Sequence, residues 1–139
     1  MKFFKKMKDG GAESTVTGYF LIEIKWLFTI VLLRFDGKSR TAFHSHAFNC
    51  LNWLLKGKLI EERIMGLLRA FNEYYVYEPS LKPFIIRRED THKVDSVGVS
   101  WVLSFRGLWT NSWKEIRPLE GSRIVTLTHG RKEVHAGVA

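Results

Sequence analysis

Two histidines stand one residue apart in the segment Phe43-His44-Ser45-His46. Side chains of a β-strand alternate between its two faces, so a strand would place both of these imidazoles on the same face. Neutral imidazole is the commonest protein ligand for late first-row divalent metals, and a third ligand from a neighbouring strand would complete a site with open positions. The pair therefore indicates a metal site.

The third ligand that we expect is His92. It lies in the segment Arg88 to Val94, which we interpret as a polar turn leading from the apolar run Phe84 to Ile86 toward the next strand. A His-x-His pair taken alone is a weak signal, since two surface or structural histidines would produce the same pattern. The interpretation therefore depends on the motifs around the pair.

Those motifs resemble the cupin superfamily, whose first motif has His-x-His, an acidic residue a few positions later and a glycine that ends the hairpin. The corresponding string here is His44-Ser45-His46-Ala47-Phe48-Asn49-Cys50, with Gly57 in the place of the glycine. The second cupin motif contributes one more histidine, commonly from a turn followed by a valine, and Asp90-Thr91-His92-Lys93-Val94 is similar to it. The resemblance implies a cupin-type β-barrel (a double-stranded β-helix, or jelly roll) with His44, His46 and His92 turned inward around a divalent metal ion.

A narrower resemblance is to small bacterial and phage cupins, which later show a Trp-containing strand, an Arg-Gly turn and a second Trp. The matching residues here are Trp101 to Phe105, Arg106-Gly107 and Trp113. The resemblance covers about residues 17 to 128. It implies a small bacterial or phage cupin that binds a small molecule.

The sequence departs from both patterns at the acidic ligand. Cys50 occupies the spacing of the cupin glutamate, and Asn49 that of the acidic residue in the narrower group. Either could be a weak metal ligand or a residue that orients an imidazole, while Cys50 also suits a small buried hydrophobe. Three imidazoles are chemically sufficient for iron, zinc, nickel or manganese, so the metal's identity stays open.

The elements that must position these residues are short runs rich in β-branched and aromatic side chains, separated by turn signals such as Asp36-Gly37 and Lys56-Gly57-Lys58. They predict an all-β fold. The window Leu59 to Phe71 has a partly helical period, weakened by Gly66, so one short helix is the alternative there. The expected strands are Thr17 to Ile24, Phe28 to Phe35, Leu51 to Leu55, Leu59 to Ile64, Glu73 to Tyr77, Pro83 to Arg87, Ser100 to Phe105, Ser112 to Ile116 and Ser122 to Thr128.

The length of 139 residues suits one domain. We expect residues 1–15 to be a basic flexible tail, because of its lysines, and residues 16–139 to form a single barrel. The lone Cys50 excludes an internal disulfide and favours a cytoplasmic location. The most apolar stretch, Tyr19 to Leu33, contains Glu23 and Lys25, which leaves Trp26 to Leu33 as its uncharged run, far too short to span a membrane. A homodimer is an option, because the apolar N-terminal strand offers an open edge.

The formal net charge of +8 favours an anionic partner, although it also suits solubility alone. Arg88 and Arg106 could neutralise a ligand's carboxylate or phosphate at the mouth of the barrel. Trp101 and Trp113 could line the ligand site, although barrel core and rim is the plainer interpretation. Glu61 or Glu62 could reach the cavity, but we expect both to face solvent.

Two functions fit these residues. The first is a metal-dependent cupin acting on a small anionic substrate, as a dioxygenase or through Lewis-acid chemistry, although no general base is evident. The second is a barrel without turnover that binds or sequesters a small anion such as a nucleotide, which in a phage protein could deplete a host signal. A nucleic-acid-binding module ranks last because it rests on charge alone.

Overall fold

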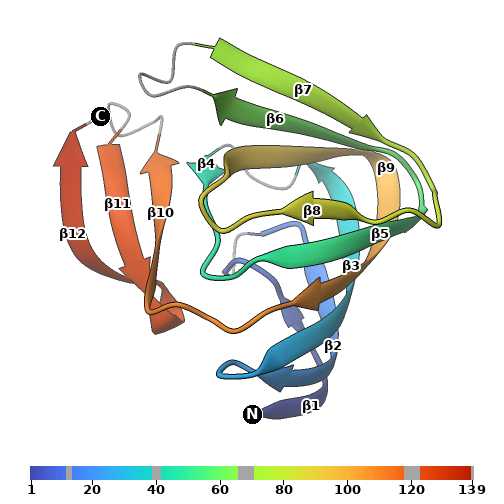
Figure 1. The fold of residues 1–139 in the computed structure, drawn as a ribbon, viewed down its shortest axis with the longest axis horizontal. Helices are drawn as coiled ribbons and strands as arrows, with labels where there is room; N and C mark the ends of the chain where they lie inside the picture. The colour runs from blue at the N-terminus through green and yellow to red at the C-terminus, as the bar shows by residue number, and fades with distance from the viewer. Residues whose placement is uncertain (12–13, 39–41, 66–70, 118–122, 139) are drawn as a thin grey trace.

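The structure is a computed structural model that describes residues 1–11, 14–38, 42–65, 71–117 and 123–138. Strands make up most of it, and these residues include no α-helix (Figure 1). The strands are β1 (Lys2–Lys8), β2 (Thr17–Ile24), β3 (Phe28–Lys38), β4 (Phe43–His44), β5 (Cys50–Lys56), β6 (Leu59–Met65), β7 (Phe71–Tyr77), β8 (Phe84–Ile86), β9 (Thr91–Arg106), β10 (Ser112–Arg117), β11 (Arg123–Thr128) and β12 (Lys132–Val138), with a 3-10 turn over His129–Arg131.

Strand β9 joins two parts of an antiparallel sheet. Its first half pairs with β6 and β4, and its second half pairs with β3 on one side and β5 on the other. Gly98, at a φ of 71°, lies between these halves. One part runs β1-β2-β3-β9-β5-β8 and the other β7-β6-β9-β4-β10-β11-β12. Figure 1 shows β10 to β12 on the opposite side of the molecule from β2, β3 and β5, as in a jelly-roll barrel.

Alternation along the strands fills the interior. On β5, Asn52 and Leu54 are buried while Leu51 and Leu55 are exposed, as a strand with one solvated face requires. A second, smaller cluster of buried residues lies next to the His-x-His segment, with Trp109 and Trp113 packed against it. The larger cluster consists of Val16, Phe20, Val31, Leu33, Leu54, Leu59 and Val102, and the smaller one of Ala47, Phe48, Cys50 and Ile86.

The all-β prediction is confirmed. Strand β2 coincides with the expected run Thr17 to Ile24, whereas the expected run Ser100 to Phe105 is only the last part of the longer strand β9. The other expected runs differ from the observed strands mainly at their ends, and residue 122 lies outside the described residues. The undecided window Leu59 to Phe71 begins with a strand, and residues 66–70 within it lie outside the described residues. That residues 16–139 form a single domain stays a prediction.

The flexible N-terminal tail is where the prediction was wrong. Residues 2–8 form β1, which pairs with β2 from Lys2 opposite Glu23 to Lys8 opposite Thr17. An edge strand needs main-chain hydrogen bonds but little burial of its side chains, and most of β1 is exposed. Its lysines are therefore compatible with a strand. In the same way β12 pairs with β11 at the other edge of the sheet.

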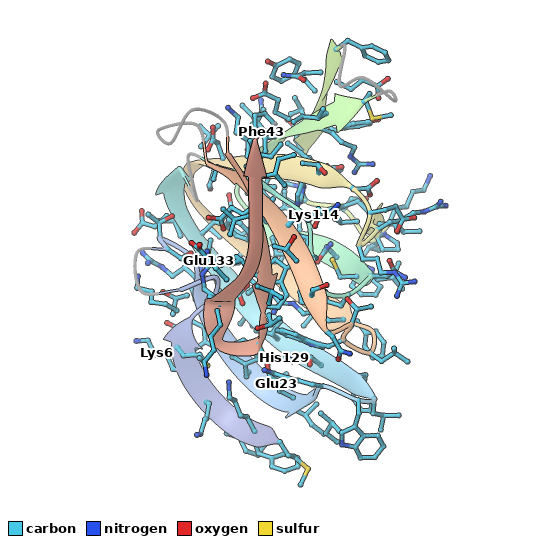
Figure 2. All side chains as sticks on the ribbon, turned by 90° about the vertical axis from the view of Figure 1, so that its left-hand side faces the viewer. Lys6, Glu23, Phe43, Lys114, His129 and Glu133 are labelled. Atoms are coloured by element: carbon cyan, nitrogen blue, oxygen red, sulfur yellow. The ribbon has the colours of Figure 1, made fainter. Side chains whose placement is uncertain are left out.

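No helix in the described parts of the chain has the length and apolar character needed to cross a membrane. Seen from the side of β12, the β1–β2 hairpin with Lys6 and Glu23 lies below the layer of β10 to β12, and His129 lies at the lower end of that layer (Figure 2). The cytoplasmic location and the homodimer stay predictions.

Gly57→Ala is expected to lower the free energy of unfolding by about 3 kcal/mol, from a strained backbone combined with overpacking. Gly57 has a φ of 96°, and a Cβ there would lie 2.6 Å from the Val99 carbonyl oxygen and 2.7 Å from Ser100 Cα. Gly98→Ala is the control, because Gly98 also has a positive φ but nothing lies within 4 Å of an added Cβ. It should lose only about 1 kcal/mol. Equal losses in urea unfolding would refute the packing argument.

Candidate metal centre

The three histidines singled out in the sequence lie together in the structure. His44 of β4 is paired in register with His92 of β9, and His46 follows two residues later. One ring nitrogen of each lies within 4.8 Å of the others, and the Nε2 atoms of His46 and His92 are 2.8 Å apart. Among the described residues, this is the one group of three metal-ligating side chains close enough to share an ion.

Main-chain contacts with β10 hold the His-x-His segment. The Ser45 amide donates to the Lys114 carbonyl at 2.9 Å, and the Lys114 amide donates to Ser45 Oγ at 3.0 Å. Ser45 thus contacts β10, and the histidines on either side of it extend into the same space, as period-two alternation predicts.

His92 does not lie in a polar turn, as we expected. The turn ends earlier, where the Asp90 amide donates to the Arg87 carbonyl at 3.0 Å, and His92 is the second residue of β9. Only alternate residues of β9 are buried, so the residues between them can be polar. For this reason the polar composition of the segment did not indicate a strand. His92 itself is 1% exposed. A place within a strand holds its ring more firmly than a turn would.

A buried carboxylate fixes the orientation of the His92 ring. Glu61 of β6 is 0% exposed, and its Oε1 lies 2.7 Å from His92 Nδ1. The other oxygen of Glu61 accepts a hydrogen bond from Tyr77 at 2.6 Å, and Arg63 donates to both oxygens at 3.0 and 3.2 Å. Because an ionised carboxylate can only accept, His92 must carry its proton on Nδ1. In the neutral ring, the Nε2 of His92 then presents a lone pair to the other histidines.

The electrostatics keep Glu61 ionised. Burial alone would raise the pKa of the Glu61 carboxyl, but hydrogen bonds from His92 and Tyr77 and the charge of Arg63 together lower it below its usual value. Burial and the Glu61 carboxylate in turn raise the pKa of Tyr77, so the phenol remains a donor. A metal-ligating histidine commonly donates its other N–H to such a carboxylate.

Two hollows meet at the histidines. An inner cavity of about 90 Å³ is lined by His44, His46 and His92 together with mostly apolar side chains of the core. An outer cleft of about 440 Å³ also reaches His44 and His46, but not His92. The cleft is lined by cationic side chains and by aromatic ones, including Lys2, Lys8, Lys25, Arg131, Phe20, Trp109 and Trp113.

Comparisons with known proteins find likeness in structure only. No family model matches the sequence, and no curated protein matches it. The Fe(II) form of the enzyme HppE matches with a TM-score of 0.58 at 10% identity, over 73% of this chain and 55% of HppE. This chain thus spans little more than half of HppE.

Two further structures extend the likeness. A cupin superfamily protein from Desulfitobacterium hafniense matches with a TM-score of 0.54 at 13% identity, over 72% of this chain and 84% of that protein. HEPD from Streptomyces albus, with 2-hydroxyethylphosphonate and Fe(II) bound, matches with a TM-score of 0.59 at 8% identity, over 76% of this chain and 24% of HEPD. The fold is that of the cupins. The resemblance seen in the sequence is therefore confirmed in three dimensions.

Among the described residues, no carboxylate belongs with the three histidines to the group that could hold an ion, so the cupin acidic ligand has no counterpart there. Asn49 is exposed, and its Oδ1 accepts a hydrogen bond from the Arg88 amide at 2.8 Å, so it holds the β8–β9 turn. Cys50 lines the inner cavity but lies outside the three-histidine group. Burial raises the pKa of its thiol, and Asn52 donates to its Sγ at 3.3 Å. Its environment thus favours the neutral thiol. The thiolate, which is the form that binds a metal, is disfavoured.

The structure separates the other candidate residues of this chain. Arg106 lines the inner cavity and Trp113 the outer cleft. Arg88 is exposed and lines neither hollow, and Trp101 packs on Tyr19 with ring centroids 5.7 Å apart, away from both.

Sequence reasoning missed the most important supporting residue, Glu61, which we expected to face solvent. A signal was present: Glu61 lies two residues from Leu59, and residues at that spacing share a face of a strand. Leu59 belongs to the core, so Glu61 follows it inward. Asp9 was missed because it was assigned to the tail, yet it lines both hollows.

Proposed function

We propose that this protein is a metal-binding cupin in which His44, His46 and His92 coordinate a divalent ion and a small anionic molecule binds beside it. The observation that carries the proposal is the convergence of three imidazole nitrogens within 4.8 Å, one of them held by a buried carboxylate. Burying a carboxylate is unfavourable unless it has partners, so its place behind a candidate ligand supports a site built for a cation.

The donor set suits several metals. Iron, zinc, nickel and manganese all accept three neutral imidazoles with positions left open, and none of them requires the missing acidic ligand. When bound, such an ion would act as a Lewis acid or, in the case of iron, support chemistry with dioxygen. The similar enzymes HppE and HEPD are iron proteins, which supports testing iron first.

The chain's own residues determine how the ligand would lie. Two lysines of the outer cleft, Lys8 and Lys25, would attract its anionic group, and Trp109 and Trp113 would exclude water. This replaces the anion-binding role expected of Arg88 and Arg106, because Arg88 lines neither hollow and Arg106 already pairs with Asp9 at 2.6 Å. The substrate of HEPD, a hydroxyalkylphosphonate, is a small anion of this kind.

A non-catalytic role in binding a nucleotide is the second candidate. It is favoured by the combination of lysines with Trp109 and Trp113 in the cleft, since a base stacks on an aromatic face and a phosphate binds lysine. A nucleotide at about 100 times its dissociation constant should add about 2.7 kcal/mol of stability. A thermal-shift screen of nucleotides in which no midpoint moves would remove this candidate.

Elemental analysis of the purified protein tests the metal proposal. We expect close to one equivalent of iron, zinc, nickel or manganese, retained after gel filtration, and almost none in the double variant His44→Ala/His46→Ala. His129→Ala is the matched control, because His129 is exposed and stacks on Trp109 outside the triad. Equal metal in the double variant, or no uptake by wild type under anaerobic loading, would overturn the proposal.

A further inference from the structure

The inner cavity contains a guanidinium that the chain itself neutralises. Arg106 is 4% exposed and lies over the rings of Phe48 and Phe20, with its Cζ atom 4.7 and 5.9 Å from the centroids. Its terminal nitrogens donate to the two oxygens of Asp9 at 3.2 and 2.6 Å. Burial would by itself lower the pKa of Arg106, but the Asp9 carboxylate raises it, so the pair is ionic.

Asp9 lies where its charge can affect which ligands enter the inner cavity. It follows β1 directly, and its amide donates to the Val16 carbonyl at 2.9 Å, which anchors it in the β1–β2 hairpin. It lines both the inner cavity and the outer cleft. A ligand beside Arg106 in the inner cavity therefore lies next to the carboxylate of Asp9.

The inner cavity offers hydrogen-bond donors without offering net charge. Arg106 Nε is buried and has no hydrogen-bond partner in the described part of the chain. Ser104 Oγ is also buried, close enough to the Cys50 thiol for its hydrogen bond to lower the pKa of that thiol. Both residues line the cavity, on the same face of β9. Asp9 and Arg106 cancel, and the raised pKa values of Cys50 and Tyr77 keep these two lining groups neutral. The cavity therefore favours a neutral hydrogen-bond acceptor, whereas cationic side chains line the outer cleft.

We propose that the inner cavity binds a short, uncharged, oxygen-bearing group such as a carbonyl or hydroxyl, and that Asp9 is the specificity-determining residue that excludes a carboxylate from it. This rests on the proposed function, since it describes how that ligand lies: its anionic group in the outer cleft or at the triad, its neutral end against Ser104 and Arg106. The cavity of about 90 Å³ has room for only a few water-sized groups.

Acetate and acetamide test this inference, because they have the same shape and differ in charge. Their affinities for the inner cavity are measured by NMR on the full-length protein after removal of metal with a chelator, at constant ionic strength. Binding is followed through ligand contacts with Ile86 and Val102, which line the inner cavity but not the outer cleft. We expect wild type to bind acetamide more tightly than acetate. In Asp9→Asn the guanidinium keeps its shape but loses its counter-charge, so acetate should gain about tenfold or more over acetamide, as expected of a charge-assisted hydrogen bond.

Two further variants make the result specific. Asp36→Asn removes the same charge from the exposed Arg34–Asp36 pair and should leave the ratio of acetate to acetamide affinity unchanged. Adding Arg106→Met to Asp9→Asn should abolish the gain. If Asp9→Asn folds poorly, acetate should raise its melting temperature and acetamide should not.

The inference would be overturned if wild type preferred acetate, or if neither the affinity ratio nor the melting temperature of Asp9→Asn responded selectively to acetate. Metal content of the same samples before chelation separates this inference from the proposed function. A protein that never takes up metal but shows the charge-dependent switch refutes the metal proposal and leaves the inference standing. A metal-containing protein without the switch does the reverse.

Discussion

His92→Ala is expected to weaken metal binding by at least about a hundredfold, more than the loss of an outer-shell partner usually does, because it removes a ligand outright. It should also destabilise the protein without metal. The ring is 1% exposed, so its loss leaves a cavity and removes a hydrogen bond from the buried Glu61 carboxylate. Together these effects should lower the free energy of unfolding by about 3 kcal/mol or more.

Metal titration and urea unfolding of the chelated protein measure the two effects separately. His129→Ala should change neither appreciably, because His129 is exposed and outside the triad. If His92→Ala bound metal as tightly as wild type, the metal would have to lie elsewhere, and the three-histidine centre would be wrong.

Glu61→Gln is the second large effect, with an expected loss of about 10 to 100-fold in metal affinity. The amide keeps the shape of the side chain but replaces one acceptor oxygen by an NH₂ donor, so it cannot accept from His92, Tyr77 and Arg63 as the carboxylate does. His92 should then lose its fixed orientation. Glu61 acts through the ring and would not touch the metal itself.

Nitrogen-15 NMR of the histidines distinguishes this role from general destabilisation. In wild type the proton should reside on His92 Nδ1, and in Glu61→Gln the two tautomers should mix. Glu62→Gln is the control, because Glu62 points to the other face and binds Lys93, Asn72 and Tyr74 near the surface. It should change stability by less than about 1 kcal/mol and leave the tautomer of His92 unchanged. Unaltered metal affinity and tautomer in Glu61→Gln would contradict the positioning role.

The strands of the barrel and the three histidines could be predicted from local patterns. Period-two alternation places His44 and His46 together whatever the rest of the fold is, and turn residues such as Gly57 mark the hairpins. The choice of His92 as third partner came from the cupin resemblance as much as from its neighbours. Neither the resemblance nor the neighbouring residues could predict the strand register. The structure shows that this register sets His44 opposite His92.

The remaining features depend on pairing between distant segments. Glu61 looks like a surface residue in sequence because its partners, His92 and Tyr77, come from two other strands. Strand β1 looks like a tail because its lysines are judged without β2 beside them. Arg106 looks like a free cation because Asp9, its partner, is 97 residues away. In each case a charged side chain is explained only by a contact that the chain's local pattern does not encode.

The most direct test of the metal centre is a crystal structure of the metal-loaded protein with anomalous diffraction recorded at the edge of the bound metal. We expect a single strong anomalous peak among His44, His46 and His92, about 2.0 to 2.2 Å from one nitrogen of each. A peak at another position, or none at the triad in crystals whose protein contains stoichiometric metal, would contradict the account.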